Sequence, residues 1–243
     1  MLTAWTLVFL FLIVTAASFT QRVTGFGFGI VVMTVLPYLL PSFGEATTLS
    51  GLLAIFTSLI PAIRMRQFLH WRKLWVILLT FLVFSWGSVQ LVTLVDGRLL
   101  KHVLGGVLIA VSLYFMFLNG RIRLRPSVPV QLGMGSLSGV MGGLFAMQGP
   151  PAVIYFLGCA EGKGEYLALT QWYFLIGNAT MSLFRAGSGL ATDIVLKMWL
   201  IALPAVFLGL WLGARVYARL HAETLRKVVY AFLAVAGLAA LLA

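Results

Sequence analysis

The chain has 243 residues, of which 61% are hydrophobic and 9% are charged, and its mean hydropathy is +1.05. A soluble domain of this composition would have no polar surface, so the chain is predicted to be an integral membrane protein made of helices. The net charge of +11 does not indicate nucleic-acid binding, because the basic residues lie in short connections between apolar runs, where they set membrane topology.

Apolar runs follow one another along most of the chain, and about 20 helical residues cross a hydrocarbon core about 30 Å thick. The first run has no basic residue ahead of it and is followed by another apolar run. We therefore interpret it as a retained membrane segment. In chain order the predicted segments are 2–20, 26–40, 46–63, 74–95, 99–118, 127–147, 150–160, 166–184, 194–213 and 224–242.

Two stretches interrupt these runs, 25–29 (GFGFG) and 143–151 (GLFAMQGPP). Glycine is too free to favour a helix, and proline lacks an amide hydrogen. At about 1.5 Å per residue, segment 150–160 reaches about half the bilayer core, which predicts a half-helix or one arm of a re-entrant hairpin. Broken backbone in hydrocarbon needs protein or water to satisfy its polar groups, so the two breaks predict a pathway. The alternative is that the glycines serve close helix packing.

The most hydrophilic connection, 121–127 (RIRLRPS), lies at the midpoint of the chain and is predicted to link two halves. A shift of 121 positions sets 25–29 over 146–150 and Arg64 over Arg185. Few letters are identical, so the repeat depends on matched spacing of breaks and arginines. We predict one integral membrane domain with a first transmembrane repeat (1–120), a basic cytoplasmic linker (121–127) and a second transmembrane repeat (128–243).

The positive charges predict which connections face the cytoplasm. The connection 64–73 and the central linker are both rich in Arg and Lys and are predicted to be cytoplasmic. If each broken pair is a hairpin, the basic loop at 215–227 is cytoplasmic as well, both chain ends are outside and the repeats are inverted. If each broken pair crosses once, the chain has eight spans and parallel repeats. We favour an all-α polytopic fold of two pseudo-symmetric inverted repeats, each with a broken helix or hairpin plus three spanning helices.

No pattern for enzyme chemistry or for a cofactor is present. The sequence lacks a Ser-His-Asp or Cys-His arrangement, a phosphate-binding loop and a cluster with metal-ligand spacing. The single cysteine, Cys159, is interpreted as a small membrane-buried hydrophobe. The acidic residues lie at predicted segment ends and connections, which disfavours a proton relay or a cation carrier.

A small anion, by contrast, needs no fixed carboxylate. Half-helices starting at Gly29 and Pro150 would point unpaired N–H groups and positive dipole ends at the membrane centre. Amide side chains are unusual in apolar helices and are candidates for that reason, although they could instead join helices by hydrogen bonds. Arg185 could instead anchor a helix at the interface. The candidate substrate-binding residues are Gly25, Gly27, Gly29, Gln148, Gly149, Pro150, Gln171, Asn178, Gln21 and Arg185.

This layout resembles the sulfite exporter TauE/SafE family of membrane permeases. Both halves carry a glycine-rich break near the start of the repeat, and 143–151 followed by 152–155 (AVIY) is similar to the family's more strongly patterned motif. Where the family usually has consecutive glycines, this chain has Ala146, Gln148 and Gly149. The resemblance implies an inner-membrane permease whose substrate is sulfite, an organosulfonate or a related sulfur-containing anion.

We therefore expect a secondary transporter that moves a small anion by alternating access around the paired breaks. It would work in the lipid bilayer, without cofactor, metal or nucleic-acid partner and without enzyme activity; no oligomeric state is predicted. The alternatives are an anion channel and a non-transporting membrane scaffold or assembly partner, in which the breaks would serve packing alone.

Overall fold

The computed structural model describes residues 4–118, 127–217 and 238, and these residues contain helices and no strand. A 3₁₀ turn (η1, Arg66–Phe68) follows α4, and a π-helical turn (Tyr114–Leu118) continues α6. The α-helices follow in the order α1 (Ala4–Thr24), α2 (Phe28–Val32), α3 (Leu36–Leu39), α4 (Phe43–Arg64), α5 (Trp71–Leu94), α6 (Gly97–Leu113), α7 (Val128–Phe145), α8 (Gly149–Cys159), α9 (Lys163–Gly187) and α10 (Asp193–Tyr217).

The helices lie where the sequence predicts apolar segments. Among the described residues, six helices are long and apolar enough to cross a membrane: α1, α4, α5, α6 with its π-helical turn, α7 and α10. At 25 residues α9 is also long enough to cross, whereas α8 has 11 residues and is too short. The predicted segment 224–242 and linker residues 121–126 lie outside the described residues.

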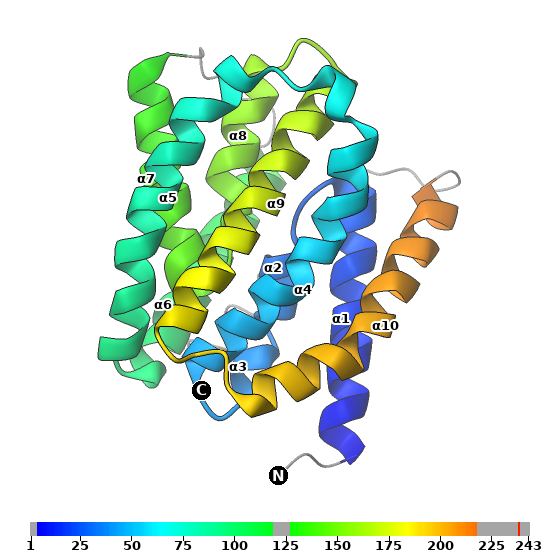
Figure 1. The fold of residues 1–243 in the computed structure, drawn as a ribbon, viewed down its shortest axis with the longest axis vertical. Helices are drawn as coiled ribbons and strands as arrows, with labels where there is room; N and C mark the ends of the chain where they lie inside the picture. The colour runs from blue at the N-terminus through cyan, green and yellow to red at the C-terminus, as the bar shows by residue number, and fades with distance from the viewer. Residues whose placement is uncertain (1–3, 119–126, 218–237, 239–243) are drawn as a thin grey trace.

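Two helix pairs on opposite flanks pack in parallel, α5 with α7 and α1 with α10 (Figure 1). In the first pair, a Cβ added at Gly139 of α7 would lie 2.7 Å from Cβ of Phe84 on α5. In the second, a Cβ at Gly209 of α10 would lie 2.7 Å from Cβ of Ser18 on α1. Small residues let helix backbones approach closely in a bilayer. Both pairs therefore depend on glycine at the contact.

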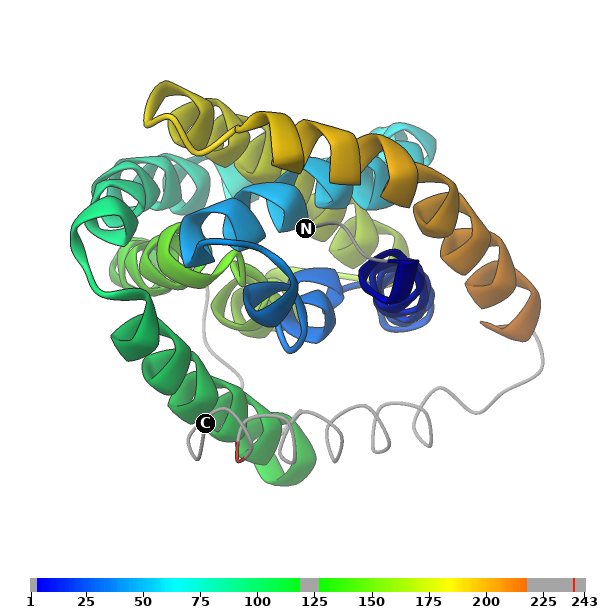
Figure 2. The same cartoon turned by 90° about the horizontal axis from the view of Figure 1, so that it is seen from below.

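The third pair, α4 with α9, forms the centre of the molecule and runs antiparallel (Figure 1). Gly51, in the third turn of α4, contacts Arg185 near the end of α9. Seen from below, the short helices α2 and α3 lie between α1 and the segment that joins α7 to α8 (Figure 2). The short helices α2 and α3 thus lie inside the molecule together with the long central pair.

An ionic cluster joins two connections at the upper end of Figure 1. Lys73 Nζ lies 2.9 Å from a carboxylate oxygen of Glu161 and 2.9 Å from one of Glu165. His70 Nδ1 lies 2.7 Å from Glu165 Oε1. The α4–α5 connection and the α8–α9 connection therefore lie at the same end of the molecule.

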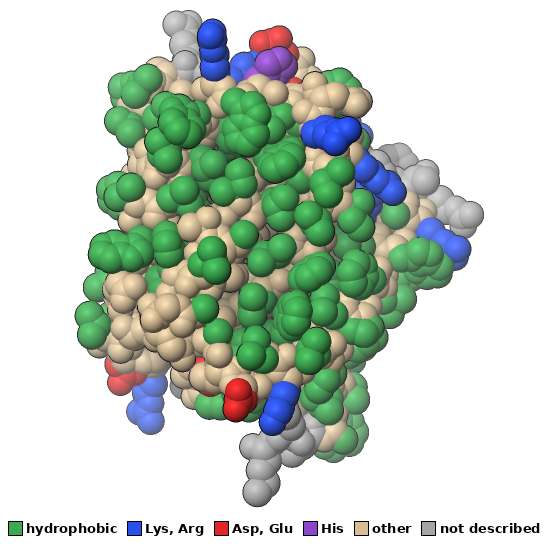
Figure 3. All heavy atoms as spheres, viewed as in Figure 1, with side chains coloured by type: hydrophobic (Ala, Val, Ile, Leu, Met, Phe, Trp, Pro, Cys, Tyr) green, Lys and Arg blue, Asp and Glu red, His purple; other side chains and the backbone are tan. Residues whose placement is uncertain are grey.

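The outer surface matches the interior of a bilayer. Large apolar side chains are exposed along the helices, for example Val83 (69%), Leu183 (71%) and Leu200 (61%). Figure 3 shows hydrophobic side chains over the middle of this face, with charged side chains gathered toward its ends and edge. Apolar surface of this extent is stable in lipid and not in water. The described residues thus form a multi-pass membrane protein.

Candidate functional site

The first break lies between α1 and α2. After α1 ends at Thr24, Gly25 and Gly27 adopt left-handed φ angles of 86° and 100°. Glycine adopts this conformation without steric cost. The turn brings the chain back into the molecule, so that α2 begins beside α1 at Phe28.

The second break lies between α7 and α8 and touches the first. After α7 ends at Phe145, Ala146 adopts a left-handed φ of 56°. On the facing α2, Gly29 lies against the carbonyl oxygen of Ala146 so closely that a Cβ would not fit. The two interruptions, 121 positions apart in the sequence, are in direct contact.

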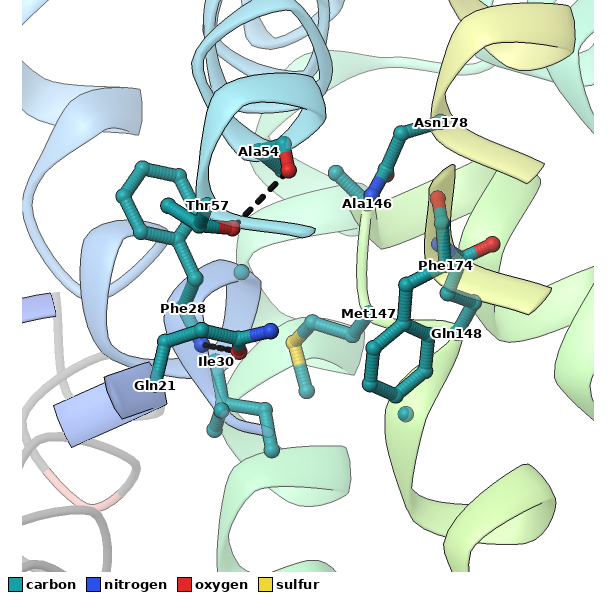
Figure 4. Close-up of a pocket in the computed structure, with 13 residues that line it drawn as sticks. Gln21, Phe28, Ile30, Ala54, Thr57, Ala146, Met147, Gln148, Phe174 and Asn178 are labelled. Atoms are coloured by element: carbon teal, nitrogen blue, oxygen red, sulfur yellow. Dashed lines mark hydrogen bonds between the residues drawn. The ribbon is translucent and has the colours of Figure 1, made fainter. Parts of the chain in front are cut away.

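A cavity lies between the two breaks and helices α4 and α9 (Figure 4). The volume in which the centre of a water molecule fits is about 30 Å³, enough for roughly two waters. The lining contains no charged side chain and offers amide and hydroxyl groups. The lining residues are Gln21, Gly27, Phe28, Gly29, Ile30, Ala54, Thr57, Ala146, Met147, Gln148, Gly149, Phe174 and Asn178.

The N-terminus of α2 is partly capped by Gln21, which is 5% exposed. The backbone N–H of Phe28 donates to Gln21 Oε1 over 3.1 Å, as Figure 4 shows. The first backbone bond of the helix runs from Val31 N to Gly27 O, over 3.0 Å. The N–H groups of Gly29 and Ile30 precede that bond and therefore have no acceptor within the helix.

The N-terminus of α8 differs from the sequence prediction. The two half-helices begin at Phe28 and Gly149, one residue earlier than the predicted starts at Gly29 and Pro150. Pro150 and Pro151 occupy the first turn of α8, and proline has no N–H. Only Gly149 supplies an N–H from that turn. Pro150, which is buried and does not line the cavity, fixes the helix start.

Gln148 is the amide side chain at the second break. Its side chain is 4% exposed, and Nε2 donates to the carbonyl oxygen of Phe174 over 3.3 Å. Its Oε1 has no partner among the described residues. Ser138 Oγ donates to the carbonyl oxygen of Gln148, and Tyr173 OH donates to Ser138 Oγ over 2.8 Å. Side chains from α7 and α9 thus fix the backbone of the break.

Gln171 and Gly25 lie next to the cavity, outside its lining. Gln171 Nε2 donates to the carbonyl oxygen of Gly25 over 2.7 Å. Both residues line an adjoining cleft together with Gln21, which also lines the cavity. Gln21 therefore lies where the cavity and the cleft adjoin, with Gln171 on the side of the cleft.

The adjoining cleft is basic. Arg22 and Arg64 line it, and Arg22 also lines a wider opening that includes Lys163. Neither lining contains an acidic residue. We call this region the basic vestibule and define it by Arg22, Arg64 and Lys163. An anion approaching from this end meets positive charge before it meets the amides.

Arg185 lies outside both the cavity and the basic vestibule. It is fully buried on α9, where Nη2 donates to the carbonyl oxygens of Gly142 (2.8 Å) and Gly143 (3.1 Å). The structure thus brings six of the candidate residues together at the cavity. Gly25 and Gln171 lie next to the cavity, and Pro150 and Arg185 lie outside its lining. The six are Gln21, Gly27, Gly29, Gln148, Gly149 and Asn178.

Thr57 is a lining residue that the sequence analysis missed. Its hydroxyl donates to the carbonyl oxygen of Ala54 over 2.8 Å, and both residues line the cavity. The shift of 121 positions that aligns the two breaks also aligns Thr57 with Asn178. That correspondence was the available signal, since a threonine in an apolar helix attracts no attention by itself.

The fold and the site define a multi-pass helical membrane protein in which two chain breaks meet at a polar cavity, an arrangement that secondary transporters use for their substrate sites. Residues 10–240 match the family described as Sulfite exporter TauE/SafE, and the chain belongs to this family. The resemblance noted in the sequence motifs is confirmed.

Among curated proteins, the chain is similar to the Probable sulfite/organosulfonate exporter TauE of Cupriavidus necator. The two are 24% identical over 224 residues, which cover 90% of this chain and 87% of that protein. No solved structure matches the chain.

Proposed function

We propose that this chain is a secondary transporter of the inner (cytoplasmic) membrane that moves a small anion by alternating access. Its substrate is sulfite, an organosulfonate or a related sulfur-containing anion. One observation carries the proposal: the breaks of the two halves touch at a cavity whose lining offers amides and no carboxylate. The name of the Cupriavidus relative supports the substrate class.

The helix pairs support two repeats, 1–120 and 128–243. The shift of 121 positions relates α1 to α7, α4 to α9 and α5 to α10. A rotation that exchanges α4 with α9 would therefore also exchange the α1–α10 pair with the α7–α5 pair. Because α4 and α9 are antiparallel, the repeats so related are inverted. Inverted repeats can exchange conformations, which is the structural basis of alternating access.

The ionic cluster supports hairpins at the two breaks. Lys73 pairs with Glu161 and Glu165, so the α4–α5 and α8–α9 connections share one end. Eight spans with single crossings at the breaks would place those connections on opposite sides. The shared end carries Arg64, Arg66 and the basic vestibule, and we assign it to the cytoplasm because cytoplasmic connections are enriched in Arg and Lys.

We infer that the cavity holds the anion through neutral donors. A sulfur oxyanion presents several acceptor oxygens, and the amide groups of Gln21, Gln148 and Asn178 can donate to them. Gly27 and Gly29 let the anion approach the backbone of the break. The cavity has room for roughly two waters, so it must widen to take the substrate. A site that widens for its substrate and closes without it fits a carrier.

The test is sulfite exchange and sulfite-dependent thermal stabilisation of the purified protein in liposomes. Gln148→Ala and Asn178→Ala are expected to reduce exchange at least tenfold, which corresponds to about 1.4 kcal/mol, without loss of folded protein. Gln131→Ala is the matched control, because Gln131 is a buried amide of α7 outside the cavity lining. Unchanged exchange in both cavity variants would refute this site, and a wild type that exchanges no sulfur anion would refute the function. Counterflow of labelled sulfite would separate a carrier from a channel.

A further inference from the structure

Arg185 has hydrogen-bond donors that nothing in the described structure satisfies. Its side chain is fully buried, yet Nε and Nη1 have no acceptor, and Nη2 alone is used, on the carbonyl oxygens of Gly142 and Gly143. Within the described residues no Asp or Glu forms an ion pair with it. Arginine stays charged in proteins, and an unpaired buried charge is costly.

The surroundings of the guanidinium suit an anion. On α4, a Cβ added at Gly51 would lie 3.1 Å from Arg185 Nη1 and 3.1 Å from Ser182 Oγ. The backbone of α4 therefore covers the guanidinium at a position without a side chain. Ser182 is itself buried, and its hydroxyl has no partner among the described residues. Two unused guanidinium nitrogens, Nε and Nη1, and one hydroxyl gather here, and no acidic side chain among the described residues accepts their hydrogen bonds.

The position of Arg185 continues the line of amides on α9. Gln171, Asn178 and Arg185 follow at intervals of seven residues, which is about two helical turns and about 10 Å each, so they share one face. Gln171 adjoins the basic vestibule, and Asn178 lines the cavity. Ser182 and Arg185 are the next polar groups along that face, on the side of the cavity opposite the basic vestibule.

The corresponding arginine of the other half has the opposite exposure. The shift of 121 positions aligns Arg64 with Arg185. Arg64 is exposed and lines the basic vestibule, whereas Arg185 is buried under α4. If the two halves exchange conformations during transport, the structure shows the state in which Arg64 is accessible and Arg185 is covered.

We propose that Arg185 is a second anion-binding position, on the closed side of the cavity, which the transported anion occupies when α4 and α9 separate. This inference rests on the proposed function. A guanidinium can donate to two oxygens of one oxyanion through Nε with Nη2 or through Nη1 with Nη2, a bidentate geometry that a lysine does not reproduce. The anion would therefore pair one of the unused nitrogens with Nη2, in place of a carbonyl oxygen of Gly142 or Gly143. The anion supplies the charge partner that the closed state lacks.

The first test compares sulfite exchange and thermal stability in Arg185→Met and wild type. Replacing a buried charge with an apolar side chain of similar volume is often neutral or stabilising. We therefore expect Arg185→Met to melt, without anion, at or above the temperature of the wild type and to exchange sulfite at least a hundredfold more slowly. Exchange at the wild-type rate in folded Arg185→Met overturns the proposal.

If Arg185→Met does not fold, the KM for sulfite of Arg185→Lys tests the proposal instead. If Arg185 only holds the carbonyl ends of α7, a lysine that keeps this contact leaves the KM for sulfite unchanged. If Arg185 binds the anion, the KM rises at least tenfold in a folded protein. A wild type that neither binds nor exchanges sulfite counts against the proposed function itself, whereas normal exchange in the Arg185 variants counts against this site alone.

Thiol labelling from each side of the membrane tests independently from which side the Arg185 site opens. Ser182→Cys in a Cys159→Ala background is expected to react with a negatively charged, membrane-impermeant thiol reagent from the side opposite the basic vestibule. Sulfite should slow that reaction. Labelling only from the vestibule side, or labelling that sulfite leaves unchanged, contradicts the proposal.

Discussion

At the residue scale, the site depends on one backbone contact between the two halves. Gly29 of α2 touches the carbonyl oxygen of Ala146, and both residues line the cavity. A side chain at position 29 would collide with a backbone carbonyl, and a backbone atom cannot move aside by changing rotamer as a side chain can. This contact fixes how closely the two breaks approach each other and hence the size of the cavity.

Gly29→Ala is therefore expected to destabilise the protein by roughly 1–3 kcal/mol, the usual cost of overpacking, and to abolish anion exchange by moving the breaks apart. Reversible unfolding in detergent and exchange in liposomes measure the two effects. The control is Gly106→Ala, because a Cβ at Gly106 of α6 meets nothing within 4 Å and alanine favours a helix by up to about 1 kcal/mol. Equal stabilities of the two variants would contradict the contact.

Ala146 is the described non-glycine residue with a positive φ. A left-handed conformation costs an L-residue other than glycine roughly 1–2 kcal/mol. Ala146→Gly removes that strain but frees the unfolded chain, so its net effect should be a gain of at most about 1 kcal/mol. Ala146→Val should lose stability, since a β-branched residue tolerates this conformation poorly. Unfolding of both variants in detergent checks the order, and a more stable valine variant would contradict it.

At the element scale, three glycines of α7 make a flat face for α5. Cβ atoms added at Gly135, Gly139 and Gly143 would each lie within 2.8 Å of the α5 backbone or a side-chain Cβ. The spacing of four residues keeps all three on one side of the helix. The interface replaces side-chain interdigitation with backbone proximity, which suits helices that gain nothing from hydrophobic burial in lipid.

Gly139→Ala should thus weaken the α5–α7 contact and destabilise the protein by roughly 1–3 kcal/mol. Gly133→Ala, on the same helix, should be neutral or slightly stabilising, because a Cβ there meets nothing within 4 Å. Melting temperatures of the two variants in the same detergent give the comparison. A loss of stability at Gly133 equal to that at Gly139 would contradict the assignment of the Gly139 effect to the α5–α7 contact, since helix propensity alone predicts a gain for both variants.

At the scale of the whole molecule, the two chain breaks decide the topology. With hairpins at both breaks, the α8–α9 connection lies on the same side as the α4–α5 connection, as the Lys73 cluster indicates. With single crossings the two connections lie on opposite sides. Both arrangements use the same apolar segments, so hydropathy alone does not separate them.

Single cysteines in a Cys159→Ala background test this arrangement. Gln67→Cys and Gly162→Cys are both expected to resist an impermeant maleimide in intact cells and to react after the membrane is opened. Thr93→Cys, at the far end of α5, should react in intact cells. Labelling of Gly162→Cys together with Thr93→Cys would contradict the hairpins and favour eight spans.

The sequence by itself determined the class of protein, the apolar segments and the two breaks. These features are local: length and composition define a span, and Gly25, Gly27 and Pro150 interrupt a helix wherever it lies. The sequence also showed that Pro150 lacks an N–H, a point that the prediction of an anion-binding helix start at that residue overlooked. The family motif was readable for the same reason, since it lies in one continuous stretch.

Only the tertiary structure decided which polar groups meet. It placed Gln148 and Asn178 at one cavity, added Thr57, and put Arg185 about 10 Å further along α9, behind Gly51. In a soluble protein, the apolar face of each helix would have indicated which of its side chains point into the interior. In a membrane the lipid-facing and the buried faces are both apolar, so the rotation and crossing of each helix are set by close contacts with its neighbours, and only the folded chain shows them.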